Sequence, residues 1–156
     1  GLILDWEIDK NITLPTLEEY CKNGWLDDKK GARVAKDLSE KVNVKTKSIF
    51  DLASSLSGGN QQKVIVAKLL SADLKVIILD EPTKGVDVGA KSAIHEIMSD
   101  LAYQGYGIIM VSSEMPEVLG MSDRIAVMRE GRLISIFDGE NASQQAILEA
   151  SMVVEH

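Results

Sequence analysis

Two short, uninterrupted apolar runs with one helical pattern between them constrain the fold of this chain more than any other feature of its sequence. The runs lie at residues 76–79 and 108–111, and the segment between them, 88–102, repeats apolar residues at helical spacing. Continuous apolar strands of this kind are typical of a parallel sheet whose strands are buried on both faces. A strand, a helix and a second strand in this order therefore predict an α/β fold.

The sequence divides near Ser54 into two expected lobes. Residues 1–55 are charged and carry helical patterns, which predicts a small helical lobe, whereas residues 56–156 alternate between strand and helix patterns. Beyond the elements already named, we expect helices at 14–20, 29–42, 61–70, 116–120 and 142–151, a break at Lys22-Asn23-Gly24, and a hairpin of strands 124–129 and 132–137 around Glu130-Gly131.

Bulk composition narrows the class of protein. At 156 residues with 45% apolar and 26% charged residues, the chain has the size and composition of one globular domain with a core. A net charge of −7 argues against a nucleic-acid backbone as the main partner, because such binding depends on clustered Lys and Arg. The apolar runs are too short to cross a bilayer, and the single cysteine, Cys21, fits a reducing compartment. We expect a soluble, cytosolic chain, and because Gly1 to Leu4 read like the middle of a domain, a piece of a longer protein.

Two adjacent carboxylates follow the first apolar run. Residues 76–83 read Val-Ile-Ile-Leu-Asp-Glu-Pro-Thr, so a buried strand would deliver Asp80 and Glu81 to the carboxyl edge of the sheet, where ligands of α/β folds bind. At that edge an Asp can hold Mg²⁺ or its waters, and a Glu can orient or deprotonate an attacking water. Taken alone, the segment is also compatible with an ordinary strand followed by an acidic turn.

A hydroxyl and two glycines precede another expected helix. Residues 56–63 read Leu-Ser-Gly-Gly-Asn-Gln-Gln-Lys, and backbone amides at a helix start that are free of Cβ obstruction make an anion site suited to a terminal phosphate. Taken alone, Ser57, Gly58 and Gly59 fit equally well a serine N-cap with a flexible Gly-Gly lead-in.

The two segments in this order resemble a known family. Residues 56–62 resemble the signature motif of ATP-binding cassette (ABC) proteins, 76–82 resemble their Walker B strand, and 83–87 resemble the D-loop that follows it. Within that family, the runs LSGGNQQK, GVDVGAK and VSSEMPE are similar to the second nucleotide-binding cassette of importers for ribose and related simple sugars. The resemblance implies the C-terminal part of a P-loop NTPase (RecA-like) core, with a small helical subdomain and without its P-loop strand.

The resemblance also implies roles for individual residues. Asp80 would serve Mg²⁺, Glu81 would be the general base, and Asp87 would contact the partner cassette. The signature residues, which would bind ATP held by the opposite cassette, are Ser57, Gly58, Gly59 and Gln61. ATP and Mg²⁺ would be cofactors of the full-length protein, an ATPase bound peripherally to the inner face of the cell membrane. Its partners would be the first cassette and, through the helical subdomain, the permease subunits.

Two departures from the family pattern bear on activity. Ser113 stands where most active cassettes have a histidine that contacts the γ-phosphate, and serine is too short to replace it and cannot carry a positive charge. The glycine-rich P-loop with its lysine does not occur in the 156 residues, so the isolated chain should be inactive. We expect two unequal ATP sites in the full transporter: a hydrolytic one that uses this chain's signature, and a slow or non-hydrolytic one around Glu81 and Ser113.

Two other classes of function stay open at this point. One is an ABC ATPase of DNA repair or translation. The acidic charge and the run at 111–117 argue against it. The other is a non-catalytic, truncated interaction module. In the family's sheet the P-loop strand lies between the strands equivalent to 108–111 and 125–128. Without it, we expect the chain to self-associate through exposed strand edges or to close the gap by shifting a strand.

Overall fold

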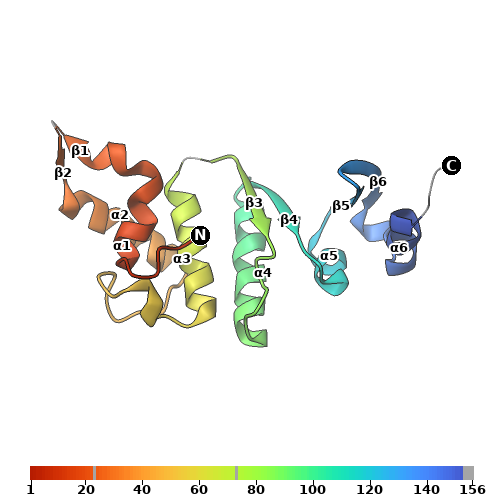
Figure 1. The fold of residues 1–156 in the computed structure, drawn as a ribbon, viewed down its shortest axis with the longest axis horizontal. Helices are drawn as coiled ribbons and strands as arrows, with labels where there is room; N and C mark the ends of the chain where they lie inside the picture. The colour runs from red at the N-terminus through yellow and green to blue at the C-terminus, as the bar shows by residue number, and fades with distance from the viewer. Residues whose placement is uncertain (23, 73, 153–156) are drawn as a thin grey trace. The chain divides into compact units, whose positions relative to one another are not determined.

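The computed structural model describes residues 1–22, 24–72 and 74–152, and the chain forms two compact units, Gly1–Ile109 and Met110–His156 (Figure 1). The first unit holds a group of helices followed by a strand, a long helix and the beginning of a second strand. The second unit holds a short helix, a hairpin and a last helix.

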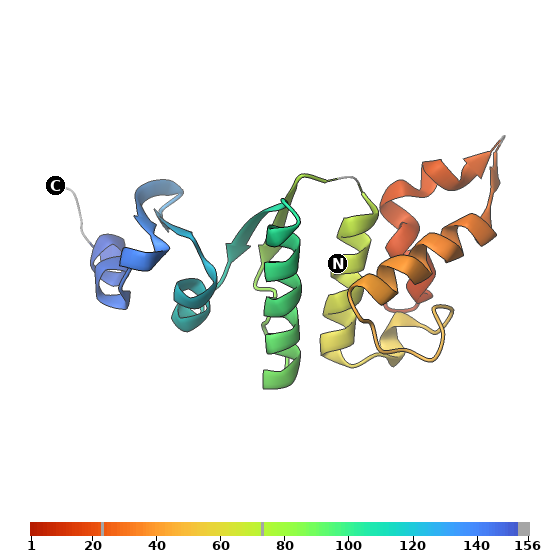
Figure 2. The ribbon, with the colours of Figure 1, turned by 180° about the vertical axis from the view of Figure 1, so that it is seen from behind.

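Three helices of the first unit share a core. They are α1 (Ile8–Thr13), α2 (Asp28–Lys41) and α3 (Gly58–Ser71), and each of them contacts the other two (Figures 1 and 2). The helix predicted at 29–42 is α2. The side chains of this core are at most 2% exposed, and they are Ile8, Ile12, Ala35, Val42, Val64 and Ala67. Burial of apolar side chains to this extent is the main stabilising term of the helical part.

A buried amide fixes the segment before α1. The Asn11 side chain is fully buried, accepts a hydrogen bond from the Ile3 amide at 2.8 Å, and donates to the Ile3 and Glu7 carbonyls at 2.9 and 3.1 Å. Glu7 also forms an isolated antiparallel bridge with Leu52. Because a buried side-chain amide is costly unless it is hydrogen-bonded, these contacts keep residues 3–7 on the helices.

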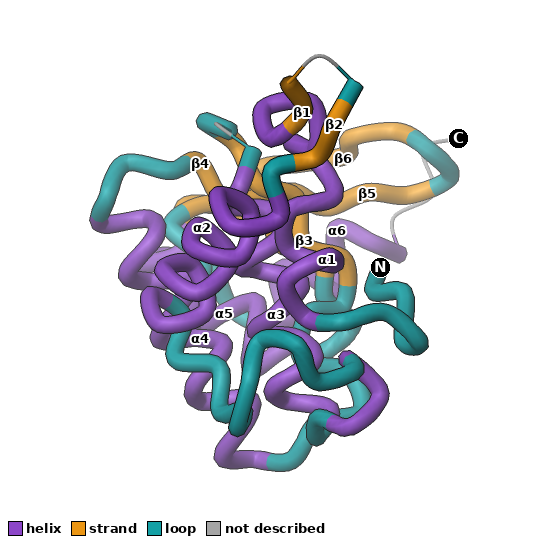
Figure 3. The backbone as a smooth tube through the Cα atoms, turned by 90° about the vertical axis from the view of Figure 1, so that its left-hand side faces the viewer, coloured by secondary structure: helices purple, strands orange, loops and turns teal. Residues whose placement is uncertain are grey.

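The helix predicted at 14–20 is a 3-10 helix, η1 (Leu14–Tyr20), rather than an α-helix. A kink at Thr16, whose φ of −119° and ψ of 27° are non-helical, explains the difference, because it interrupts the α-helical hydrogen-bond pattern. The predicted break follows: β1 (Cys21–Lys22) and β2 (Trp25–Leu26) pair antiparallel, with Gly24 at φ 81°, and Asn23 lies outside the described residues. This hairpin projects from the helices, as Figure 3 shows.

A strand, a helix and a second strand follow in the predicted order, and the second strand begins in the first unit and ends in the second. β3 (Val76–Asp80) and β4 (Gly107–Val111) are neighbours in a two-stranded sheet, and α4 (Val88–Tyr103) connects them. The Gly107 amide donates to the Lys75 carbonyl at 2.8 Å at the start of the pair. The helix α4 buries Ile94, Met98 and Leu101, packs against α3, and begins at a cap formed by Asp87.

The prediction that the strands are buried on both faces is wrong. In β3, Ile77 and Leu79 are 2% and 8% exposed, whereas Val76 and Ile78 are 53% and 65% exposed. Alternate side chains of a strand point to opposite faces, so one face of β3 is covered and the other is open. In β4, likewise, Ile109 and Val111 are exposed.

The second unit is a hairpin between two helices. The strands β5 (Arg124–Arg129) and β6 (Arg132–Asp138) pair antiparallel around Glu130 and Gly131, whose φ angles of 49° and 77° are those of the turn that favours hairpins. The predicted hairpin is confirmed. Its small core contains Ile125, Val127 and Ile147, and the flanking helices are α5 (Met115–Met121) and α6 (Gln144–Met152).

The compact units divide at a different place from the two predicted lobes. Because α3 packs on both α1 and α2, it joins the helical part and α4 to one unit. The functional division at residue 55 stays a prediction. Among the described strands, β3 pairs with β4 and β5 with β6, so the sheet topology does not include the predicted strand shift that would close the gap.

Candidate functional site

The first turn of α3 presents its backbone amides beside a serine. Ser57 is the N-cap in extended conformation, and its carbonyl accepts the first helical hydrogen bond from the Gln61 amide at 2.9 Å. Its hydroxyl makes no capping bond and instead accepts a hydrogen bond from the Asn60 side chain at 3.0 Å. Amides in the first turn have no acceptor inside the helix, and a Cβ at Gly58 would meet nothing within 4 Å. The geometry therefore leaves room for an anion at Gly58.

Polar side chains that follow the two glycines tie the start of α3 to the loop before it. The Gln61 side-chain nitrogen, Nε2, donates to the carbonyls of Ala53 and Leu56, each at 3.2 Å. The Asn60 side-chain oxygen accepts from the Lys45 amide at 2.8 Å. The ammonium of Lys63, which is 9% exposed, donates to the Asn43 carbonyl at 3.0 Å. In this structure Gln61 thus braces the loop next to Ser57.

The carboxylates Asp80 and Glu81 lie at the end of β3, as predicted. Asp80 is exposed, and Glu81 is half-buried with a left-handed backbone at φ 48°. A non-glycine residue in this conformation is strained by roughly 1–3 kcal/mol, and such strain occurs preferentially at functional sites. The Glu81 carbonyl accepts from the Lys84 amide at 3.2 Å, which starts the turn toward α4, and Thr83 within it is 3% exposed.

Asp87 caps α4. Its side-chain oxygen accepts a hydrogen bond from the Ala90 amide at 2.9 Å, which satisfies one of the free donors in the first turn of the helix. The acidic position that was predicted to contact a partner cassette therefore also has a structural role within its own chain.

Gly59 brings the start of α3 against the start of α4. A Cβ added at Gly59 would lie 2.4 Å from the Ala90 Cβ, a distance that real Cβ atoms do not reach. Gly59 is buried, whereas Gly58 is exposed. The two adjacent glycines therefore differ: the first faces open space, and the second allows close helix packing.

Ser113 belongs to the second unit. It is exposed and lies, with Ser112, at a cavity of about 200 Å³ whose remaining walls are Met115, Val118, Ile125, Ala126, Val127, Met128 and Ile147. The Ser112 hydroxyl donates to the carboxylate of Glu117, which is 5% exposed. The structure thus brings the residues at 57–61 and 87–90 together, and places 80–81 at the start of the turn that leads to Asp87.

Several residues of these loops were not anticipated from the sequence. In the sequence, Asn60, Lys63 and Ala90 stand out only as parts of motifs, and Glu117 only as part of the run at 111–117. The signal for Asn60 and Lys63 is their polar character directly after two glycines, where a helix begins. Nothing in the sequence pattern identifies Ala90, because its importance depends on where α3 lies.

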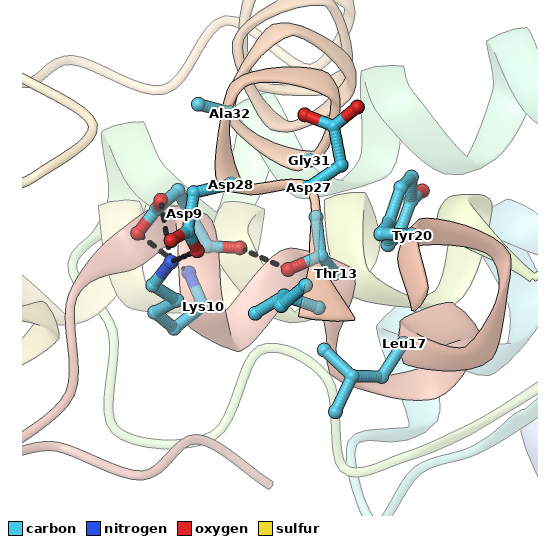
Figure 4. A pocket seen from close by; sticks show the side chains of 10 residues that line it. Asp9, Lys10, Thr13, Leu17, Tyr20, Asp27, Asp28, Gly31 and Ala32 are labelled. Atoms are coloured by element: carbon cyan, nitrogen blue, oxygen red, sulfur yellow. Dashed lines mark hydrogen bonds and ion pairs between the residues drawn. The ribbon is translucent and has the colours of Figure 1, made fainter. Parts of the chain in front are cut away.

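A second, smaller pocket lies between α1 and α2 (Figure 4). Lys10 lies 2.6 Å from an Asp28 oxygen and 3.8 Å from an Asp9 oxygen. Burial raises the pKa of Asp9 above its ordinary value, and the hydrogen bond to Asp28 raises the pKa of Lys10. At about 10 Å³ the cavity has room for about one water molecule.

The described residues form neither a metal-binding cluster of His, Cys, Asp or Glu side chains nor a helix suited to cross a membrane. No three His, Cys, Asp or Glu side chains in residues 1–22, 24–72 and 74–152 gather closely enough to hold a metal ion. In the same part of the chain, no helix combines the length and apolar character needed to cross a bilayer.

The chain belongs to the ABC transporter family. The family model for ABC transporters matches residues 6–84, about half of the chain, including the start of α3 and the end of β3. The two segments singled out in the sequence, 56–63 and 76–83, therefore both lie within the match. The recognition of an ABC protein from these motifs is confirmed.

Among curated relatives, the ribose import ATP-binding protein RbsA of Lactococcus lactis subsp. cremoris is 48% identical over 149 residues. That alignment covers 96% of this chain and 30% of the relative. The protein of the same name from Halalkalibacterium halodurans is 48% identical over 148 residues, with 95% and 30% covered. The chain thus spans about 30% of the length of the curated relatives it matches.

A solved structure supports the fold. The dimeric post-hydrolysis state of an ATP-binding cassette bound to ADP and phosphate superposes with a TM-score of 0.73, at 21% sequence identity, and covers 88% of this chain and 59% of that one. The predicted fold class is therefore confirmed: the chain has part of the P-loop NTPase fold of an ABC cassette.

Proposed function

We propose that this chain is the part of a ribose-type importer ATPase that carries the signature, Walker B and D-loop segments of its second cassette. The observation that carries the proposal is the 48% identity, across 96% of the chain, to proteins named as ribose import ATP-binding proteins. The apolar strand that ends at Asp80 and Glu81, and the open glycine amide at Gly58, supply the chemistry that such a cassette needs.

In this proposal the start of α3 completes the ATP site of the opposite cassette. The Ser57 hydroxyl and the amides of Gly58 and Gly59 donate to the γ-phosphate of ATP held by the first cassette's P-loop. Gln61 keeps these donors in place through its bonds to Ala53 and Leu56. Fixed donors directed at the transferring phosphoryl group stabilise the charge that develops there, which is a large catalytic term.

The carboxylates at the end of β3 serve the other ATP site. Glu81 accepts the proton of the water that attacks the γ-phosphorus, the bond to the bridging oxygen breaks, and ADP and inorganic phosphate leave. Asp80 is exposed and fits a Mg²⁺ ion, which in nucleotide sites takes one or two carboxylates together with phosphate and water oxygens. Bound there, the ion would neutralise charge on the phosphates. Asp87 contacts the partner cassette.

The two ATP sites are unequal in this proposal. Ser113 stands at the histidine position of the site that contains Glu81, and its hydroxyl can neither carry a positive charge nor reach as far as an imidazole. That site is therefore slow or inactive, and the site completed by Ser57 hydrolyses ATP. The full-length protein works on the inner face of the cell membrane, with the first cassette and the permease subunits as partners.

The test uses the full-length ATPase, assembled with its permease in proteoliposomes, and measures ATP hydrolysis and uptake of labelled ribose. Ser57→Arg places a bulky cation among the phosphate donors and should lower both rates by about 10²-fold or more. Glu81→Gln should leave most of the ATPase rate. Ser54→Arg, at an exposed position three residues earlier, is the matched control and should leave both rates unchanged.

Reversal of the two effects, with Glu81→Gln inactive and Ser57→Arg active, would show that the two sites do not differ in this way. Absence of ATP-dependent ribose uptake by the wild-type assembly, with hydrolysis intact, would instead point to a different cargo.

A further inference from the structure

The first turns of α3 and α4 meet where Gly59 faces Ala90. The two helices stand side by side in Figure 1 and again from behind in Figure 2. Among the described residues, the atoms within 4 Å of a Cβ built on Gly59 both belong to Ala90: its Cβ at 2.4 Å and its Cα at 3.6 Å. The packing at this point therefore depends on one methyl group facing a residue that has none.

Ala90 is itself fixed by a hydrogen bond to the N-cap of α4. Its backbone amide donates to the Asp87 carboxylate at 2.9 Å, so the cap fixes the turn from which the methyl projects. Alanine and glycine are close to the smallest pair of residues that can form such a contact. A larger side chain at either position therefore fits only if one of the two helices shifts. A change in the position of Ala90 is thus passed directly to Gly59.

Neighbouring contacts leave the start of α3 little other freedom. Asn60, the residue after Gly59, is bonded to the Lys45 amide, and Lys63 in the following turn is bonded to the Asn43 carbonyl. These bonds hold the outer side of the turn to the helical part. The side of the turn that carries Gly59 is held by packing against Ala90 of α4.

We propose that Ala90 is a positioning residue for the signature segment: its methyl sets how far the Gly58 and Gly59 amides lie from α4, and so from the nucleotide phosphate that they face. Asp87 caps α4 by accepting a hydrogen bond from the Ala90 amide. Ala90 therefore also connects the D-loop to the signature segment of the same cassette. The inference rests on the proposed function, because it concerns phosphate held by the opposite cassette.

The test adds a methyl group at position 59 of the full-length ATPase and then removes the one at position 90. Gly59→Ala must separate α3 from α4, and we expect ATP hydrolysis to fall by about 10²-fold, since a displacement near 1 Å in a catalytic group can cost that much. Gly59→Ala combined with Ala90→Gly removes the 2.4 Å clash and should return the rate to within about fivefold of wild type.

A matched double variant separates this contact from general effects on the helix. Gly59→Ala combined with Ala93→Gly introduces the same glycine into α4 one turn away, where no atom lies within 4 Å of the Gly59 Cβ position. It should not recover activity. Ala93→Gly alone should keep the wild-type rate. Recovery by Ala93→Gly as large as by Ala90→Gly would overturn the proposal, as would failure of Ala90→Gly to recover any activity.

Nucleotide labelling identifies which site changes. Photoaffinity labelling with an azido-ATP, followed by separation of the two cassettes by proteolysis, should show that Ala90→Gly alone weakens labelling at the first cassette's P-loop. The same variant should raise the KM for ATP and lower kcat, each by about threefold, because the displaced donors contact both bound ATP and the transition state. This variant only removes a methyl group and introduces no clash, so it tests the proposal even if Gly59→Ala does not fold. Equal loss of labelling at both P-loops would indicate a purely structural role and overturn the proposal.

The outcomes also separate this inference from the function on which it rests. If the wild-type ATPase neither labels nor hydrolyses ATP, the proposed function is wrong. If wild type is active and the Gly59 and Ala90 variants do not compensate each other, only the positioning role is wrong.

Discussion

The helical part of the first unit and the strands that follow it bury their apolar side chains to very different extents. In the helical part, Ile8, Ile12 and Val64 are fully buried, whereas in β3 and β4 every second apolar side chain is about half exposed or more. An amphipathic helix needs cover on one side only, and three helices can give this to one another. A strand that is apolar on both faces needs cover on two sides. The chain covers the apolar side of its helices, but it covers only one of the two apolar faces of its strands.

The largest expected effect is in the helical core. Ile12→Ala should lower the free energy of unfolding by about 3–5 kcal/mol, because the side chain is fully buried and the helices cannot close the cavity completely. Urea unfolding followed by circular dichroism measures the change. Ile3→Ala, at a position that is 37% exposed, is the control and should cost less than about 1 kcal/mol. Equal losses for the two variants would mean that the core lies elsewhere.

Two adjacent isoleucines in β3 test the difference within one strand. Ile77 is 2% exposed and Ile78 is 65% exposed. Ile77→Ala should therefore cost about 2–3 kcal/mol of unfolding free energy, and Ile78→Ala less than about 1 kcal/mol. The two variants differ in sequence by one position, so each controls the other in the same unfolding experiment. Similar costs would show that the outer face of β3 is also covered.

The open faces and edges of the strands should make the chain self-associate. Exposed apolar surface on strands tends to bind another copy, and a charge placed there prevents it. Sedimentation equilibrium should give an average mass that rises with concentration for the wild-type chain and rises less for Ile78→Lys, an effect on association of about 1 kcal/mol. Ser99→Lys on exposed α4 surface is the control. A wild-type chain that stays monomeric would contradict the prediction.

The smallest expected effect is a pH dependence in the helical part. Because burial raises the folded-state pKa of Asp9, the folded chain binds more protons than the unfolded chain between the ordinary and the raised pKa. The stability that the protonated group confers is complete below the ordinary pKa and is lost as pH rises through the raised one. The groups that also act on it are Lys10, Glu7 and Asp28.

Asp9→Asn does not titrate at this position, so its unfolding free energy relative to wild type should increase as pH rises through that window. Unfolding in urea at a series of acidic to neutral pH values measures this difference. Asp37→Asn, at an exposed position on α2, is the control and should show a much weaker trend. A difference that decreases with rising pH would mean that the ion pair with Lys10 outweighs burial.

Helices and strands were predictable where apolar residues recur with one clear spacing or form one continuous run. The helix predicted at 88–102 is α4 (Val88–Tyr103), and the strands predicted at 76–79 and 108–111 are β3 and β4 with one residue added to each. Local chemistry explains this accuracy: Asp87 is an N-cap, and the hairpin turn at Glu130-Gly131 has the glycine that its backbone requires.

Features that depend on distant partners were not predictable. The short helix α1 has too few turns for a period to be recognised, and Asn11 within it matters only because residues 3–7 fold back onto it. The start of α3 was predicted three residues late, because Gly58 and Gly59 disfavour helix interiors although they are tolerated in a first turn. The contact of Gly59 with Ala90 requires the positions of two helices.

The site was predicted from the sequence as a set of residues, and the structure adds how they are held. Asp80 and Glu81 do follow the buried strand, but the strained backbone of Glu81 could not be foreseen, since glutamate has no preference for positive φ. The roles of Ser57, Asp87 and Ser113 toward nucleotide stay predictions until the full-length ATPase is assayed.

The exposed tryptophan of the β1–β2 hairpin offers an optical probe. Trp25 is 81% exposed and Trp6 is 44% exposed, and they are the two tryptophans of the chain. Replacing Trp6 with phenylalanine would leave fluorescence from the hairpin alone, with emission at long wavelength and strong quenching by iodide. Any surface that covers the hairpin would shift that emission to shorter wavelength and protect it from iodide. The chain can thus report contact at this tip without an attached dye.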